Sequence, residues 1–490
     1  MKNVIRISLI LLMILVVSGC SKEYLSPSPE TNLLLEDAFN TKSRIVGQVN
    51  GMYAFMKVGA YLGGRYHVYN DIRADNFIPK SSNLVTAYAT WNHSLLGSRD
   101  EVQNLWGAIY AAVNAINIFL DGLESNWTAG NLTGKITEAE YNQYKSEAYT
   151  LRAMCYFDLL QLYAQPYNKN NGTSPGMPLL LTANTLGGNN DLARSTVAET
   201  YTQILSDLNT AEPLAAATYS SALLRTTRIH KNTIIAYKTR VYLHMGNYPA
   251  VKTEAAKIVS ATAPFVSATG AQFGLSPTFA ALWITPYTSN ESIFSMPFTP
   301  TNLPGTQNAL AHYNHPSSSE AYYLNVTGAA YTALGATDAR RLLFQTGTVS
   351  GSTRYFVGKW QSFTVQSDYA PVLRYAEVLL NYAEALVRDG SVVTQQAVDL
   401  LNAVRTRSLA TGAYAIGDFA DATAFINAVL LERNIEFLGE GIRNMDLMRT
   451  LTTIPTKGGV EAIPSTSPSY IWPIPDSEIS TNKLMTGNGN

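Results

Sequence analysis

Glu432 and Glu436, one helical turn apart, have the spacing that most resembles a pair of catalytic carboxylates. A glycosidase needs two carboxyl groups on opposite sides of a bound sugar, roughly 5 to 9.5 Å apart. Residues four apart on a helix instead face the same way, and Arg433, Arg443 and Arg449 follow within "ERNIEFLGEGIRNMDLMR". Because buried charges persist mainly when they are paired, we interpret these glutamates as part of a structural ion-pair network.

The histidine pair His312 and His315 in "HYNHP" has a spacing that could place both rings on one metal ion. The segment has no nearby acid and no HExxH helix, so we favour a loop pair without metal. The Asn-rich stretch "NKNNGTSPG" could hold calcium, but ordinary turn chemistry explains it better. With no Gly-rich phosphate loop and no GxSxG elbow, we expect no cofactor and no catalytic residue.

Aromatic residues in Gly-, Asn- and Ser-rich segments are the clearest candidates for ligand contacts. A sugar has an apolar face of C–H groups and a rim of hydroxyls, so a flat ring beside Asn, Arg or Asp suits both parts. Each ring could equally fill the core, because aromatic side chains bury large areas in any fold. The candidates are Tyr61, Tyr66, Tyr88, Trp91, Trp283, Tyr287 and Tyr313.

Cys20 stands where an apolar run ends, in "LVVSGCSKEYLSPSPE". Lys2 and Arg6 give a positive start, residues 7–17 are apolar but short for a membrane span, and two small residues precede the cysteine. This pattern resembles the lipobox of bacterial lipoproteins. We expect residues 1–19 to be a signal peptide and Cys20 to be lipidated; an ordinary secretory signal with an incidental cysteine is the alternative.

Composition narrows the function classes for the mature chain. Of the 490 residues, 46% are hydrophobic, which indicates a globular body. The net charge of −1 becomes −3 when Lys2 and Arg6 leave with the signal peptide, so no general attraction to nucleic acid is expected. We find no second apolar run that approaches membrane-spanning length and expect a soluble body.

Helical periodicity dominates the rest of the chain. Apolar residues recur at helical spacing in 41–56, 102–120, 144–163, 197–214 and 232–245. The stretch "LRYAEVLLNYAEALVRDGSVVTQQAVDLLNAVRTRS" predicts a helical hairpin of about tetratricopeptide length. Long Gly-, Asn-, Ser- and Thr-rich segments separate the helices, and loops this long are usually functional. They cover residues 59–101, 165–193, 262–370 and 408–421.

Motifs along most of the mature chain resemble the SusD/RagB family of outer-membrane lipoproteins. The matching stretches are "LWGAIYAAVNAINIFL", "SEAYTLRAMCYFDLLQLYAQPY", "RSTVAETYTQILSDLNTAEPL", "PVLRYAEVLLNYAEAL", "LNAVRTRS", "LLERNIEFLGEGIRNMDLMR" and "YIWPIPDSEISTNKLM". No single motif is decisive, but their order and spacing together are specific. The sequence departs from the usual family pattern at Ala164 and Gln165.

The resemblance implies a mainly α-helical, SusD-like fold with tetratricopeptide-like hairpins and long ligand-facing loops. It also implies a non-catalytic lipoprotein on the outer face of the outer membrane, which captures nutrients for a SusC-like TonB-dependent transporter. The family's ligand contacts lie in variable loops, so no ligand residue is transferred from it.

We therefore expect a protein that binds an oligo- or polysaccharide. A peptide-binding RagB-like member and a surface glycosidase are the alternatives. The expected organisation is a signal peptide over residues 1–19, an N-terminal region of helical hairpins over 20–225, and a C-terminal region with loop insertions over 226–490.

Overall fold

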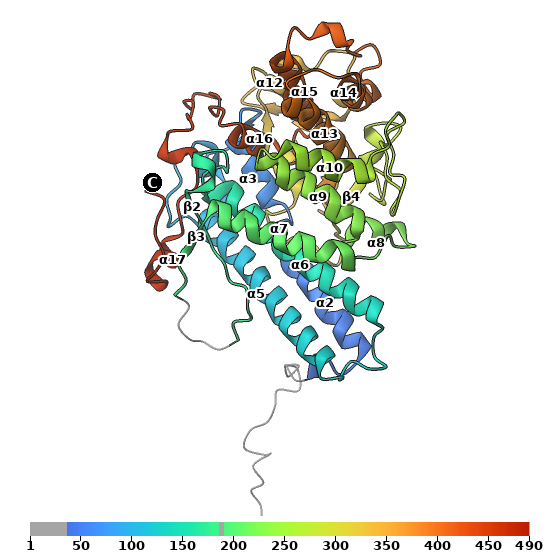
Figure 1. Ribbon diagram of the computed structural model, residues 1–490. Helices are drawn as coiled ribbons and strands as arrows, with labels where there is room; N and C mark the ends of the chain where they lie inside the picture. Colours follow the sequence, from blue (N-terminus) through green and yellow to red (C-terminus); the bar gives the residue numbers. More distant parts are fainter. Residues whose placement is uncertain (1–36, 186–190, 490) are drawn as a thin grey trace, which may run out of the picture.

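Helices dominate the computed structural model, which describes residues 37–185 and 191–489 (Figure 1). The expected signal peptide and Cys20 lie outside these residues. The long helices are α2 (Lys42–Met56), α5 (Asp100–Thr128), α6 (Glu138–Tyr163), α7 (Val197–Leu214), α9 (Lys231–His244), α10 (Tyr248–Ile258), α13 (Tyr375–Gly390), α14 (Gln395–Ser408) and α15 (Ala422–Glu436). Each helix predicted from periodicity is present, so the mainly α-helical fold is confirmed.

Local sequence signals explain where several of these helices begin and turn. Capping boxes of Thr137 with Glu140 and of Thr196 with Glu199 start α6 and α7, because each pair satisfies backbone N–H groups that the first turn leaves free. The predicted hairpin is α13 and α14, joined through Ser391 with φ 53°. The bundle of α2, α5, α6 and α7 occupies one end of the molecule, and α13 to α15 lie toward the other (Figure 1).

One described helix, α5, is long and apolar enough to cross a membrane by length and composition. The expectation that no second run reaches that length is therefore wrong. Half of its most apolar window is buried inside the fold, and α5 packs against α2 and α6. A core helix passes the same test because it too buries one broad apolar face.

Short helices and strands occur both inside and outside the segments expected to be loops. The short helices are α3 (Arg65–Arg73), α4 (Tyr88–Trp91), α8 (Ala222–Thr227), α11 (Leu310–Asn314), α12 (Ala329–Ala333), α16 (Arg443–Arg449) and α17 (Asp476–Thr481). The antiparallel pairs are β1 (Phe77–Pro79) with β5 (Tyr322–Leu324), β2 (Pro175–Pro178) with β3 (Arg194–Thr196), β4 (Ser292–Met296) with β8 (Ala370–Arg374), and β6 (Phe344–Val349) with β7 (Ser352–Val357).

Pairing of β1 with β5 brings the first long segment against the third. Lys80 extends this contact, because its backbone N–H donates to the Ala321 carbonyl at 2.9 Å and its ammonium donates to the carbonyls of Pro316 and Ser318. One hydrophobic core extends from Ala38 to Met485 and underlies both segments. The irregular parts of the chain are thus packed against the helical scaffold.

Candidate functional site

Five of the seven predicted aromatic rings are buried: Tyr61, Tyr66, Trp91, Trp283 and Tyr313. Tyr61 donates a hydrogen bond to Asp158 at 2.6 Å, and the Trp91 indole N–H donates to the Phe77 carbonyl at 2.7 Å. The structure places these five rings in the core, which is the alternative that the sequence left open for each of them. The sequence did not indicate this burial, because a helix buried on all sides shows no apolar stripe. Tyr66 belongs to α3, whose residues from Tyr66 to Arg73 are all buried.

Tyr88 and Tyr287 remain half-buried. Tyr88 opens α4 and lies 5.5 Å from the Trp91 ring, close in sequence to the exposed Leu84 and Val85. Tyr287 instead lies among other rings and a carboxylate. The structure therefore separates these two candidates, and Tyr287 has the richer surroundings.

Five residues from three segments form what we call the aromatic–acid cluster: Tyr287, His315, Phe363, Asp368 and Tyr369. The Tyr287 and Tyr369 rings lie 5.0 Å apart, between centroids, at 33°. The rings of His315 and Phe363 are stacked at 4.9 Å and 8°. Asp368 lies between the two pairs, because it accepts a hydrogen bond from Tyr287 and interacts electrostatically with His315.

The four rings of the cluster are half-buried, so each retains exposed area. Neighbouring apolar side chains add to it: Ile284 is 60% exposed and Val365 is 43% exposed. Tyr287 has φ 61°, a left-handed backbone conformation that is uncommon for a bulky residue and often marks functional sites. This part of the surface therefore offers flat apolar area around one hydrogen-bonded acid.

Burial shifts the pKa of three groups in the cluster. Burial raises the pKa of Asp368, while hydrogen bonds from the Tyr287 hydroxyl and the Ser362 backbone N–H oppose that change. Burial lowers the pKa of His315, so its ring is neutral at pH 7. Burial and then Asp368 raise the pKa of Tyr287 to about 12. The cluster thus joins one buried acid to three aromatic rings and an imidazole.

Sequence analysis considered His315 only as a metal ligand and did not select Phe363, Asp368 or Tyr369. The available signal was the pattern "SFTVQSDYAP", in which two aromatic residues and an aspartate lie inside a long loop-rich segment. Among the residues that the structure describes, no group of three or more His, Cys, Asp or Glu is arranged to hold a metal ion.

Glu432 and Glu436 belong to a buried ion-pair network, as interpreted from the sequence, and that interpretation is confirmed. The expected partners are wrong. Arg340 contacts both glutamates, at 2.5 and 3.2 Å, while Arg374 and Arg407 contact Glu436 as well. Burial alone would raise the pKa of Glu436, but the surrounding arginines hold it below its usual range.

The three arginines that follow in sequence pair with other acids. Arg433 and Arg449 both contact Asp446, at 2.8 and 2.7 Å, and Arg443 contacts Asp75 at 2.9 Å. The Arg449–Asp446 pair follows helical spacing within α16, whereas Arg433 and Arg443 reach acids outside their own helices, which local spacing does not show.

Two family models match this chain. Residues 23–243 match the model of a SusD-like family described as "Starch-binding associating with outer membrane", and residues 317–490 match the model of the SusD family. A SusD superfamily protein from Bacteroides fragilis is 30% identical, with a TM-score of 0.81, over 92% of this chain and 100% of that one. The chain belongs to the SusD family.

Two further proteins match over nearly the whole chain. SusD-like protein P38 of Formosa agariphila is 23% identical, with 96% of each chain covered. Surface glycan-binding protein A from Bacteroides thetaiotaomicron, solved in complex with laminarihexaose, is 17% identical with a TM-score of 0.71, over 92% of this chain and 100% of that one. The last likeness shows a shared fold. SusD-family proteins are associated with the outer membrane.

Proposed function

We propose that this SusD-family protein captures an oligo- or polysaccharide at the aromatic–acid cluster. The observation that carries the proposal is the arrangement of two ring pairs around Asp368 on a partly exposed surface. Rings contact the C–H face of a sugar, and the carboxylate accepts from its hydroxyls. Asp368 is 9% exposed and accepts from the Tyr287 hydroxyl and from the backbone N–H groups of Ser362 and Gln361. A carboxylate can accept about four hydrogen bonds, so acceptor capacity remains for one sugar hydroxyl.

The family membership supports a saccharide ligand. One matching family model carries the description of starch binding, and one relative of the same fold is solved with a bound glucan, laminarihexaose. An open platform of this kind accepts a long chain, since the polymer can extend beyond the rings on either side.

We further propose that the protein is a lipoprotein anchored at Cys20 on the outer face of the outer membrane. Each buried CH₂ of an acyl chain contributes roughly 0.8 kcal/mol to membrane binding, so several chains anchor a protein firmly. The polar, Pro-rich segment after Cys20 would act as a tether, and tethering raises the effective concentration at a neighbouring protein.

The partner in this proposal is a SusC-like TonB-dependent transporter, which takes the captured glycan inward. We also propose the division of the mature chain into residues 20–225 and 226–490. Two separate family matches support two regions, and the first of them extends past the proposed boundary to residue 243.

A binding screen over neutral and acidic polysaccharides, combined with an assay for released reducing ends, tests the function. We expect binding to at least one polysaccharide and no release of product. Binding to peptides alone would favour the RagB-like alternative, and steady release of reducing ends would favour a glycosidase; either result overturns the proposal.

A further inference from the structure

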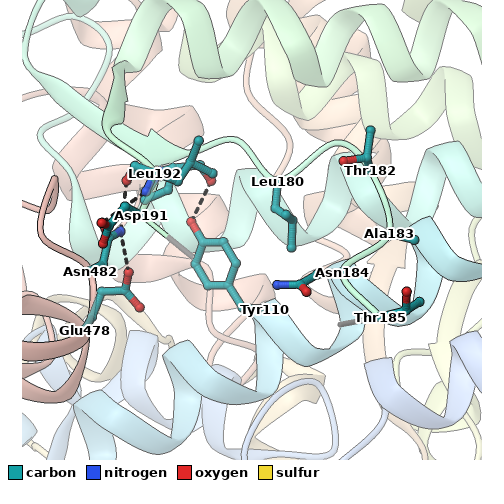
Figure 2. A pocket seen from close by; sticks show the side chains of 11 residues that line it. Tyr110, Leu180, Thr182, Ala183, Asn184, Thr185, Asp191, Leu192, Glu478 and Asn482 are labelled. Atoms are coloured by element: carbon teal, nitrogen blue, oxygen red, sulfur yellow. Dashed lines mark hydrogen bonds between the residues drawn. The ribbon is translucent and has the colours of Figure 1, made fainter. Parts of the chain in front are cut away.

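A second concave site, separate from the aromatic–acid cluster, lies where α17 and the segment after β2 meet α5 (Figure 2). The cavity has a volume of about 470 Å³ and shares no residue with the aromatic–acid cluster. This volume lies within the range of roughly 300–1,000 Å³ found for small-ligand sites, toward its lower end. The cavity therefore fits a short ligand better than a polymer.

Tyr110 of α5 provides a rigid aromatic wall. Its ring packs against Trp106 at 4.9 Å between centroids, and its hydroxyl donates to the Pro178 carbonyl at 2.9 Å. Because Trp106 holds the ring and Pro178 holds the hydroxyl, the Tyr110 side chain loses little conformational entropy when a ligand packs on its exposed part. Leu180 extends the apolar wall beside Tyr110 (Figure 2).

A fixed polar wall faces this ring. The amide of Asn482 donates to Glu478 at 2.9 Å and exchanges two hydrogen bonds with the backbone of Leu192, at 2.9 and 3.0 Å. Glu478 also accepts from the Trp106 indole N–H at 3.2 Å. These bonds hold the Glu478 carboxylate in place at the cavity, and Figure 2 shows it on the same side of Tyr110 as Asn482.

Asn184 lies on the other side of Tyr110, and its position is set by its backbone. Its N–H donates to the Asn114 side chain at 2.8 Å, and its carbonyl accepts from the same amide at 3.0 Å. Figure 2 shows the Asn184 side chain directed toward the Tyr110 ring. An amide and an aromatic face thus converge on the same space.

Charge restricts the ligand further. Glu478 and Asp191 both line the cavity, whereas none of its described lining residues is Lys or Arg. Arg194 interacts electrostatically with Tyr110, but it does not line the cavity, and its guanidinium donates to the carbonyls of Pro175, Gly176 and Thr486. An anionic ligand would therefore meet the Glu478 carboxylate with no cation among the described lining residues, which costs binding energy. A ligand with several hydroxyl donors and one apolar face suits the ring, the amide and the acids together.

We propose that this cavity binds a short neutral saccharide of one or two sugar rings and excludes acidic sugars. The site goes beyond the polysaccharide platform proposed above, because it is concave, includes acidic residues in its wall and is built from other elements. It would hold a short fragment or a chain end independently of polymer bound at the aromatic–acid cluster.

Titration of the full chain by NMR or calorimetry tests the site, with maltose, cellobiose and laminaribiose as neutral probes. Tyr110→Ala should weaken binding of the best disaccharide by about tenfold or more, as expected for a lost stacking contact. Asn184→Ala should weaken it by about threefold to tenfold with the fold retained, because backbone contacts place this residue. Tyr248→Ala, a half-buried tyrosine on α10, is the matched control and should leave the affinity unchanged.

Glucose and glucuronic acid form a second pair of probes that tests the charge argument. Wild type should bind glucose more tightly than glucuronic acid. Glu478→Gln should reduce the ratio of these two affinities. The proposal is overturned if no neutral disaccharide binds, if glucuronic acid binds as tightly as glucose, or if disaccharide affinity falls only in the cluster variant Tyr369→Ala. These outcomes are separate from the polysaccharide screen, since a protein whose platform binds polymer can still fail each of them.

Discussion

The Tyr287 hydroxyl donates a hydrogen bond of 2.8 Å to Oδ1 of Asp368, joining residues 81 positions apart in the sequence. The same carboxylate accepts from the Ser362 backbone N–H at 2.8 Å, and Tyr369 places its ring 5.0 Å from that of Tyr287. The two loops therefore hold each other in the arrangement that the proposed glycan platform requires, before any ligand arrives. Such preorganisation lowers the entropy lost on binding.

Removal of one platform ring should weaken glycan binding without unfolding the protein. Tyr369→Ala is expected to reduce the affinity for the bound polysaccharide by about 1–3 kcal/mol, the range seen when a stacking ring is removed. Isothermal titration calorimetry measures this, with Tyr248→Ala as a control of the same residue type and similar exposure. Equal losses in both variants, or no loss in Tyr369→Ala, would place the polysaccharide elsewhere.

Replacement of Trp91 should affect stability rather than affinity. The side chain is 5% exposed, and its indole N–H donates to the Phe77 carbonyl at 2.7 Å. We expect Trp91→Ala to lower the free energy of unfolding by about 3–5 kcal/mol, as for other buried Trp truncations, while the folded fraction binds glycan normally. Urea denaturation and calorimetry measure the two quantities. A stable variant with weakened binding would restore Trp91 as a ligand contact.

Glu101 should make the protein less stable as pH rises. Burial raises its pKa to about 7, against 4.5 for an ordinary glutamate, so between those values the folded state holds more protons than the unfolded state. Stability from this group is therefore fully present below about pH 4.5 and is lost as the pH rises to the folded-state pKa of about 7. Between pH 5 and pH 8, Glu101→Gln should gain about 2.5 kcal/mol in stability relative to wild type. Urea midpoints at pH 5, 6, 7 and 8 check this, and parallel curves for the two proteins would contradict it.

Cys20→Ala should release the protein from the membrane fraction, because the proposed acyl anchor is lost. Cys155 provides the matched control: it is a free thiol buried in α6, so Cys155→Ala removes a cysteine without touching the anchor. Fractionation after a salt wash, followed by mass spectrometry of the N-terminal peptide, distinguishes the variants. Retention of Cys20→Ala with the membranes would show that another feature anchors the chain.

The transporter partnership predicts a physical complex. A tagged wild-type protein, purified in mild detergent from outer membranes at native expression, should bring down a TonB-dependent barrel of the SusC type. Deletion of the gene should slow growth most on long or scarce glycan, where capture limits uptake. Repeated purifications without such a barrel would rule out a stable complex with this transporter class.

The sequence alone determined the helical scaffold of this protein. Apolar spacing over Val197–Leu214 and the Thr196–Glu199 capping box are local signals, and the structure has α7 with those bounds. The α13–α14 hairpin was predictable for the same reason, since periodicity and the turn lie within one short stretch. The ordered series of motifs along the chain likewise identified the family.

Only the tertiary structure decided which residues reach the surface and which meet. Trp283 and Tyr287 stand four positions apart, yet the first is buried against Trp360 and the second joins the aromatic–acid cluster. Arg340 donates a hydrogen bond to Glu436, which lies 96 residues away in the sequence. Helix formation depends on neighbours a turn away, whereas ring burial and ion pairing depend on how distant segments pack, and no local spacing contains that information.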